Sequence, residues 1–268
     1  MLDLISAFES DLQCPTCGGN LQFKRKTSDI RCENNDSHNF QIINEIPRFV
    51  ERGEISPEDA KWVFDYDQRA ESYDAALEFY NEKLDTHLRD SYLELADHLP
   101  VKQNQSILDV SVGTGNVNLA IKQVYPNLKL KLAGIDLSIG FLQVALEKFK
   151  KGGIQSLLLH SQVHSLPFKN NRFDIVTHSG GINTFSNIPR TLTEWVRVLK
   201  PEGTLVFVDE GLSPAVRKTH RGESILKWNT LFSAKPPLDD LPFNVKNIKL
   251  WWTARGTFYV ITCQKGEI

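Results

Sequence analysis

The sequence predicts an α/β protein, in which a doubly wound sheet of seven strands follows a small cysteine-rich module. Two observations support this prediction. From residue 105 onward, short apolar runs alternate with amphipathic runs at helical spacing, which is typical of parallel strands covered by helices on both faces. The first 50 residues instead hold three of the four cysteines. We therefore expect a module over 1–50, a linker and helical cap over 51–104, and a core over 105–268.

The composition is that of a soluble globular protein and weighs against several functions. The 268 residues carry 31 Lys and Arg against 33 Asp and Glu, which disfavours nucleic-acid binding by phosphate neutralisation alone. No run approaches the roughly 18 apolar residues of a membrane span. The N-terminus has no basic stretch before its apolar residues, so we expect no secretory signal and a cytoplasmic location.

The cysteines of the first module have the spacing of a metal site. Cys14 and Cys17 enclose a Pro-Thr pair and precede two glycines, which allow a tight turn. Cys32 and His38 form a second pair. Zinc takes four such ligands at tetrahedral corners, and four protein ligands leave no open position for a reacting water. The sequence thus predicts a structural zinc site of the zinc-ribbon kind.

A redox Cys-x-x-Cys pair is the alternative, but such a pair normally opens a helix. Here 21–23 and 29–31 indicate the two strands of a hairpin instead. A module of about 50 residues also has too little core to fold without support such as a metal. Cys263, far along the chain, is interpreted as a strand residue.

The linker and cap follow the module. Residues 51–58 are polar and include a Gly and a Pro, which favours a domain boundary there. Ser56 and Pro57 have the pattern of a helix start. The helical stretch that follows is rich in aromatic residues, which we expect to pack at the join with the core: Trp62, Phe64, Tyr66, Tyr73, Phe79 and Tyr80. A second helix is predicted over 84–99.

The core alternates strands and helices until its last two strands. Strands are expected at 106–110, 130–136, 156–160, 173–178 and 204–209, with helices at 115–124, 141–149 and 188–199. The stretches 245–252 and 257–264 have no helix between them, so we expect an antiparallel hairpin that closes a Rossmann-like parallel sheet. Residues 211–243 form an insertion rich in apolar residues that could serve as a lid.

Ligands bind such sheets at the carboxyl ends of the strands. The first strand runs into a glycine loop, and Asp109 could fix that loop through hydrogen bonds to its amides. The second ends at Asp136, where an acid can bind both hydroxyls of a ribose. A nicotinamide enzyme would require a third glycine in the loop, and the sequence has only two.

Four motifs in order, over 107–115, 134–138, 165–176 and 197–205, resemble the signature of class I S-adenosylmethionine-dependent methyltransferases. The stretch 66–74 is similar to the helix that precedes the core in the ubiquinone and menaquinone methyltransferases. With its cysteine module, the chain also resembles bacterial ribosomal-RNA guanine methyltransferases. The resemblance covers about residues 60–265.

The resemblance implies S-adenosylmethionine as cofactor, and it assigns roles to individual residues. Asp136 would bind the ribose, and Gln162 stands where the family has an Asp for the adenine amino group. Ser111 stands where the family has Gly, so its Cβ could crowd the cofactor. The candidate cofactor-binding residues are Tyr73, Asp109, Ser111, Gly113, Gly115, Asp136, Leu137, Gln162, Val163 and His178.

The acceptor side is less well defined. Methyl transfer is an in-line displacement that depends on orientation, and a base matters only when the acceptor must lose a proton. His178 is the candidate base and Asn183 could orient the acceptor, although His178 could equally be a satisfied polar residue at a strand end. Asp209 and Glu210 end a later strand and could face either the acceptor or water.

Three functions remain open. The favoured one is methylation of a small-molecule acceptor, with 211–243 as lid. The second is ribosomal-RNA methylation, with Lys24, Arg25 and Lys26 gripping RNA, but residues 1–50 hold five basic and seven acidic side chains. The third is a non-catalytic module whose zinc ribbon docks a protein partner. The sequence does not predict an oligomeric state.

Overall fold

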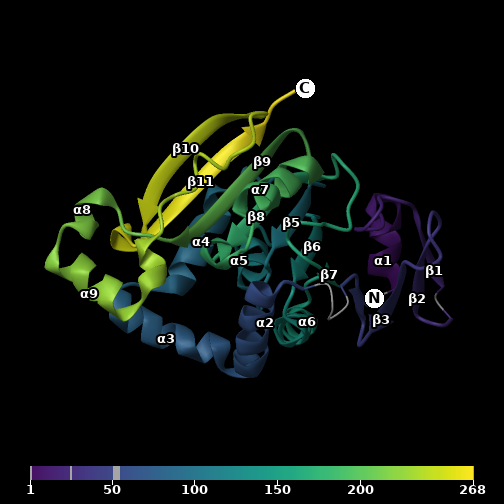
Figure 1. Cartoon of the computed structure of the whole chain (residues 1–268), viewed down its shortest axis with the longest axis horizontal. Helices are drawn as coiled ribbons and strands as arrows, with labels where there is room; N and C mark the ends of the chain where they lie inside the picture. Colours follow the sequence, from purple (N-terminus) through teal and green to yellow (C-terminus); the bar gives the residue numbers. More distant parts are fainter. Residues whose placement is uncertain (1, 25, 51–54, 268) are drawn as a thin grey trace.

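The computed structural model describes residues 2–24, 26–50 and 55–267, and one mixed sheet runs through it (Figure 1). In the described residues this sheet has eleven strands in the order β1-β2-β3-β4-β7-β6-β5-β8-β9-β11-β10. The strands are β1 (Leu21–Lys24), β2 (Asp29–Cys32), β3 (Asn39–Ile43), β4 (Ile46–Arg48), β5 (Ser106–Val110), β6 (Lys131–Asp136), β7 (Ser156–His160), β8 (Phe173–Ser179), β9 (Leu199–Glu210), β10 (Val245–Thr253) and β11 (Phe258–Lys265). The helices are α1 (Leu2–Phe8), α2 (Pro57–Arg69), α3 (Tyr73–Leu84), α4 (Leu88–His98), α5 (Asn116–Val124), α6 (Ile139–Gly152), α7 (Ile188–Val198), α8 (Pro214–Arg217) and α9 (His220–Trp228).

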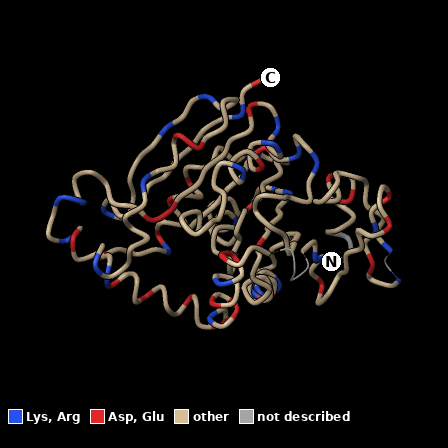
Figure 2. Tube along the Cα trace, viewed as in Figure 1, with Lys and Arg blue, Asp and Glu red and all other residues tan. Residues whose placement is uncertain are grey.

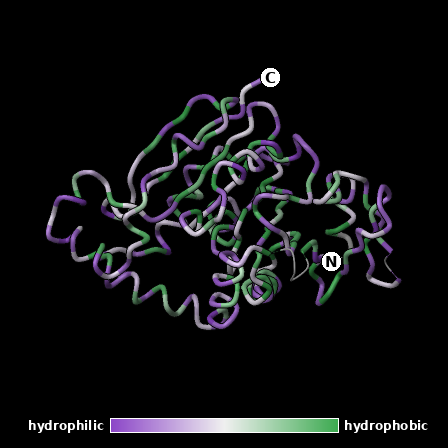
Figure 3. Tube along the Cα trace, viewed as in Figure 1, coloured by the Kyte–Doolittle hydropathy of each residue, from purple (hydrophilic) through white to green (hydrophobic). Residues whose placement is uncertain are grey.

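The parallel part of the sheet, β7-β6-β5-β8-β9, is buried on both faces. Every residue of β5 and β7 is buried, as expected for apolar runs covered by helices on both sides. Alternate residues of β5 enter different clusters: Leu108 packs with α1 and α7 on one face, whereas Ile107 packs with α4, α5 and α6 on the other. Many green, hydrophobic stretches of the trace in Figure 3 accordingly lie in the centre of the molecule, where these strands run.

The seven strands expected for the core sheet become eleven because the N-terminal module extends it. β4 pairs in parallel with β7 through Arg48 and His160, so β1–β4 continue the same sheet. The predicted hairpin is present as β1 and β2, and the predicted C-terminal hairpin as β10 and β11, which runs antiparallel to β9. The boundary predicted over 51–58 falls partly on residues 51–54, which lie outside the described residues.

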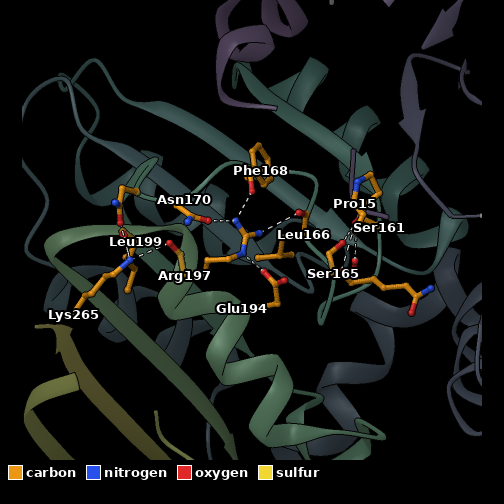
Figure 4. Close-up of polar contacts among 12 residues, drawn as sticks. Pro15, Ser161, Ser165, Leu166, Phe168, Asn170, Glu194, Arg197, Leu199 and Lys265 are labelled. Carbon is orange, nitrogen blue, oxygen red and sulfur yellow. Dashed lines mark hydrogen bonds and ion pairs between the residues drawn. The ribbon is translucent and has the colours of Figure 1, made fainter. Parts of the chain in front are cut away.

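Helix α1 attaches the module to the core. Phe8 packs against Phe168 and Phe173, with ring centroids 6.4 and 6.3 Å away. On the far side of the loop 166–170, Arg197 of α7 donates to the carbonyls of Phe168 and Leu166, at 2.7 and 3.3 Å (Figure 4). The loop is thereby held between α1 and α7.

The cap lies over one end of the sheet. Ser56 caps α2 by accepting a hydrogen bond from the Asp59 amide at 3.1 Å, as its sequence pattern predicts. In Figure 1, α2 lies beside α6, and α3 extends toward α8 and α9 of the 211–243 insertion. Basic and acidic residues are interspersed over the outer parts of the trace, the N-terminal module included (Figure 2). Within the described part of the chain, no helix has the length and apolar character needed to cross a membrane.

Candidate active site

A cavity of about 590 Å³ lies at the carboxyl ends of the parallel strands, beneath the cap. Its walls come from the loop after β5, the ends of β6 and β9, the segments after β7 and β8, the helices α2, α3 and α4, and the insertion. A volume in this range suits a small organic ligand or cofactor. Seven of the predicted cofactor-binding residues line it: Tyr73, Ser111, Gly113, Asp136, Leu137, Gln162 and Val163.

Asp136 and the glycine loop form one hydrogen-bonded unit. The Gly113 amide donates to one Asp136 oxygen at 2.8 Å, and the Ser138 amide donates to the other at 2.9 Å. Burial raises the pKa of Asp136 to about 6, against the effect of these amides. Gly113 has a φ of 53°, and a Cβ there would meet only Phe141 at 4.0 Å, so the surface above this glycine is open to the cavity.

Asp109 does not fix the loop, contrary to the sequence-based expectation. The register of β5 and β8 places it opposite Thr177, whose hydroxyl donates to Asp109 at 3.1 Å. The loop amides are used elsewhere, since Gly113 donates to Asp136. Asp109 is fully buried and is not among the lining residues, and burial raises its pKa to about 8.

Gly115 also lies outside the cavity lining. Its φ is 86°, and a Cβ would lie 2.5 Å from the Phe149 ring, so the glycine allows α6 to approach the loop closely. Ser111 does line the cavity, and its φ of 56° is a left-handed conformation that costs a non-glycine residue about 1 kcal/mol or more.

The cap contributes aromatic rings to the cavity, although the sequence pattern predicts mainly a packing role for them. Tyr66 and Tyr73 contact the ring of Phe141, with centroids 5.1 and 4.8 Å apart, and Trp62 stacks on Tyr66 at 6.0 Å. All four residues line the cavity. The signal for Tyr66 was present in the sequence, because Tyr-Asp occurs at 66–67 and again seven residues later, on the same side of a helix.

The two aspartates of those Tyr-Asp pairs hold the cap in place. Asp67 accepts hydrogen bonds from Ser138 and Gly140 at the start of α6. Asp74 accepts from Thr114 in the glycine loop at 2.7 Å and forms an ion pair with Lys148 of α6, also at 2.7 Å.

His178 and Asn183 do not line the cavity, and their catalytic roles stay predictions. His178 is fully buried, its Nδ1 donates to the Val110 carbonyl at 2.9 Å, and burial lowers its pKa to about 4. Asn183 donates to Asp209 at 3.0 Å. Asp209 is fully buried and so does not face water, whereas Glu210 lines the cavity.

Comparison with known proteins assigns the fold to a family. The ubiE/COQ5 methyltransferase family matches residues 62–218, which include the cap, the glycine loop and Asp136. The chain belongs to this family. The match leaves out the cysteine module and also residues 219–268, which hold α9 and the hairpin of β10 and β11.

Curated relatives of the family cover part of the chain. It is 33% identical over 144 residues to demethylmenaquinone methyltransferase of Thermotoga maritima, covering 54% of this chain and 59% of that protein. It is 38% identical over 108 residues to the Bacteroides fragilis protein of the same name, covering 39% and 43%. The chain thus spans three fifths or less of the length of these relatives.

Solved structures support the fold. Phosphoethanolamine N-methyltransferase 2 of Haemonchus contortus, in complex with S-adenosyl-L-methionine, superposes with a TM-score of 0.58 at 16% identity, covering 82% of this chain and 62% of that one. The [4+2]-cyclase SpnF superposes with a TM-score of 0.54 at 16% identity, covering 75% and 96%. At such identities the likeness establishes the fold and no activity.

Proposed function

We propose that the protein transfers a methyl group from S-adenosylmethionine to a small organic acceptor. The observation that carries this proposal is that the two sides of the cavity differ in the chemical character of their residues. The loop 111–114 and Asp136 line the cavity from the sheet, and Trp62 and Tyr66 line it from α2 of the cap. A polar cofactor half and an apolar acceptor half thus share a single enclosed space.

The residues of the first half fit the cofactor. Asp136 is held by two amides with its carboxylate at the cavity, where it would accept hydrogen bonds from ribose hydroxyls. The open surface above Gly113 would admit the methionine part, and Leu137, Gln162 and Val163 would flank the adenine. When bound, S-adenosylmethionine supplies an electrophilic methyl group on a positively charged sulfur.

The chain itself supplies enclosure and orientation. Trp62, Tyr66 and Tyr73 lie on the cap, so their rings exclude water from the acceptor half. From the insertion, Leu231 adds an apolar side chain, as expected of a lid. Because the relatives are named demethylmenaquinone methyltransferases, a reduced naphthoquinone is the first acceptor to test.

Calorimetric titration with S-adenosylhomocysteine tests the cofactor assignment. We expect Asp136→Ala to weaken binding about tenfold to a hundredfold, because two hydroxyl contacts to a carboxylate are lost. Asp97→Ala, at an exposed position of α4, serves as the control and should bind as the wild type does. Equal affinity of Asp136→Ala and wild type would contradict the proposed site.

Ribosomal RNA is the alternative acceptor, and it stays a prediction. Lys24 and Lys26 are exposed on the module, and Arg25 lies outside the described residues. Wild-type protein should methylate a soluble short-chain reduced naphthoquinone but not purified ribosomal RNA. Methylation of the RNA alone, lost on charge reversal at Lys24 and Lys26, would replace the small-molecule proposal.

We also propose that Cys14, Cys17, Cys32 and His38 bind a structural zinc ion. Their ligand atoms all lie within 4.8 Å of one another, with the sulfurs of Cys17 and Cys32 3.4 Å apart and the Cys14 sulfur 3.5 Å from His38 Nδ1. Such distances suit corners of a tetrahedron with zinc–sulfur bonds of about 2.3 Å. The other ring nitrogen of His38 contacts Asn35 at 3.3 Å, which would orient the imidazole.

Metal analysis tests this second proposal. Purified protein should contain about one zinc per chain, and Cys14→Ser should lose the metal and melt at a lower temperature. Cys263→Ser is the matched control, because that thiol is buried in β11, far along the chain from the module. Full zinc content in Cys14→Ser would exclude the site.

A further inference from the structure

We propose that Glu210 is the residue of the cavity that contacts the methyl acceptor, and that its carboxylic acid donates a hydrogen bond to an oxygen atom of the acceptor. This inference rests on the proposed function, because it assigns the far end of the same cavity. It also defines the acceptor class: a flat apolar molecule that carries a carbonyl or hydroxyl oxygen.

The position of Glu210 places it away from the cofactor half. It ends β9, and Asp136 ends β6, with β5 and β8 between them in the sheet. Three strand spacings separate the two residues by roughly 14 Å. The sulfur of S-adenosylmethionine is bonded directly to the ribose C5′. When the ribose is bound at Asp136, the sulfur therefore stays close to that residue and does not reach Glu210. The carboxyl therefore lies in the acceptor half.

The other acidic residues of the cavity are occupied by protein partners. Asp136 binds two backbone amides. Asp59 accepts from the hydroxyls of Ser56 and Ser186, and Asp65 pairs with Arg69. In the part of the chain that the structure describes, the side chain of Glu210 contacts only the neighbouring Asp209 carboxyl and its own backbone amide as hydrogen-bonding partners. Glu210 also lines the cavity, so its remaining hydrogen-bonding capacity is available to a bound molecule.

The surroundings determine which member of the carboxyl pair holds the proton. Asp209 accepts hydrogen bonds from three N–H groups, namely the Ile182 amide, the Asn183 side chain and the Glu210 amide. These donors stabilise a negative charge on Asp209, and two carboxyls in contact do not both ionise. Burial, and then the charge of Asp209, raise the pKa of Glu210 well above its ordinary value.

The cationic side chains described near the pair do not oppose this arrangement, because Arg69, which lines the cavity, is paired with Asp65. His178 lies 3.7 Å from Asp209, and burial lowers its pKa to about 4, so it is neutral. The phenols around Glu210 come from the cap and from β11, and burial raises the pKa of each; they are Tyr66, Tyr73, Tyr80, Tyr92 and Tyr259. The neutral Glu210 acid is therefore surrounded by neutral phenols, with the charged Asp209 carboxylate as its neighbour.

A carboxylic acid in such a wall acts as a positioned donor. Its proton would hold an oxygen of the acceptor in place, in a space from which the cap excludes water, so that the nucleophilic atom faces the methyl group in line with the breaking carbon–sulfur bond, whose electron pair stays on the sulfur. An acceptor without that oxygen would leave the buried carboxyl unpaired and would be rejected.

The experiment compares Glu210→Gln with Glu210→Leu, since both substituents have nearly the volume of Glu. The probe is a reduced short-chain demethylmenaquinone, and S-adenosylhomocysteine affinity is measured in parallel. Because the Gln amide still donates, we expect kcat/KM to fall by no more than about fivefold, whereas Leu leaves the acceptor oxygen unpaired and poorly oriented and should lower it about a hundredfold. Cofactor affinity should stay at the wild-type level in both.

Two kinetic results would overturn the inference. Wild-type kcat/KM in Glu210→Leu would mean that the side chain does not contact the acceptor. An equal loss in the Gln and Leu variants would identify Glu210 as a base.

A ¹³C spectrum of glutamate-labelled protein, assigned with Glu210→Gln, supplies a check that does not depend on the acceptor. The Glu210 carboxyl should be protonated near neutral pH, and the signal of an ionised carboxylate would also overturn the inference. A wild type that binds cofactor but methylates no probe would count against the proposed function, while the spectrum still decides the state of Glu210.

Discussion

The carboxylate of Asp67 in α2 accepts a hydrogen bond of 2.6 Å from the hydroxyl of Ser138, the residue that caps α6. The Gly140 amide donates to the same oxygen at 2.9 Å. Ser138 also donates its own amide to Asp136. One chain of hydrogen bonds thus connects the cap that covers the cavity to the acid proposed to hold the ribose.

This contact depends on the missing side chain of Gly140. A Cβ at that position would lie 2.9 Å from the Cβ of Ala70 and 3.2 Å from the Cα of Asp67, so Gly140→Ala should displace α2 from α6. We expect S-adenosylhomocysteine affinity to fall about tenfold or more. Gly152→Ala is the control in the same helix, because its Cβ would have no neighbour nearer than 3.7 Å. If both variants bound alike, the cap would not depend on this close approach.

Local patterns in the sequence were sufficient to locate the core strands and Asp136. Each strand from β5 to β9 is a buried apolar run between turn residues, and Asp136 is identified by its place at a strand end. Partners distant in the chain were not predictable. Asp109 was assigned to the loop amides because they are its sequence neighbours, but the pairing of β5 with β8 brings Thr177 to it.

The same limit applies to the module and to Glu210. A single parallel pair, Arg48 with His160, joins β4 to β7, and no periodicity marks such an edge. For Asp209 and Glu210, the sequence left open whether they face water or the acceptor. Their environments differ because the Ile182 amide and the Asn183 side chain, both from another loop, bind Asp209, whereas Glu210 lines the cavity.

Ser111 places a side chain in the cavity at a position where the family that the motifs resemble has glycine. Its left-handed φ of 56° and its place in the lining predict that Ser111→Gly removes both backbone strain and a Cβ from the cavity. We expect S-adenosylhomocysteine to bind several-fold more tightly. Asn104→Gly relieves a similar φ of 64° at an exposed loop, so it should change the melting temperature but not the affinity. Weaker binding by Ser111→Gly would indicate that the hydroxyl itself contacts the cofactor.

The raised pKa of Asp136 predicts a pH dependence of cofactor affinity. Ribose hydroxyls bind the carboxylate better than the acid, so binding must remove the proton when the pH is below the pKa of about 6. Affinity should therefore be constant above about pH 7 and fall about tenfold per pH unit below about pH 6. His160 and His178, each with a pKa near 4, stay neutral over this range. Calorimetry on Asp136→Asn should show weaker binding without this slope; a wild-type affinity that is flat down to about pH 5 would contradict the assignment.

The proposed zinc site should influence cofactor affinity, because the turn that carries Cys14 is attached to the loop beside the adenine side. The Pro15 carbonyl accepts from the Ser165 hydroxyl at 2.8 Å, and the opposite end of this loop is fixed by Arg197 (Figure 4). Between β7 and Ser165 the same segment presents Gln162 and Val163 to the cavity. Chelation that releases the metal should free one end of the segment and lower S-adenosylhomocysteine affinity about fivefold, the equivalent of about one hydrogen bond.

Ser165→Ala separates this coupling from general unfolding. In the zinc-loaded protein it should lower affinity by a similar factor while zinc content stays full, and chelation should then have little further effect. Thr27→Ala, in the exposed turn between β1 and β2, should leave both affinity and its response to chelation unchanged. A chelated protein that keeps its circular dichroism melt for the core and binds S-adenosylhomocysteine as tightly as before would mean that the module is joined to the sheet without positioning the cavity loop.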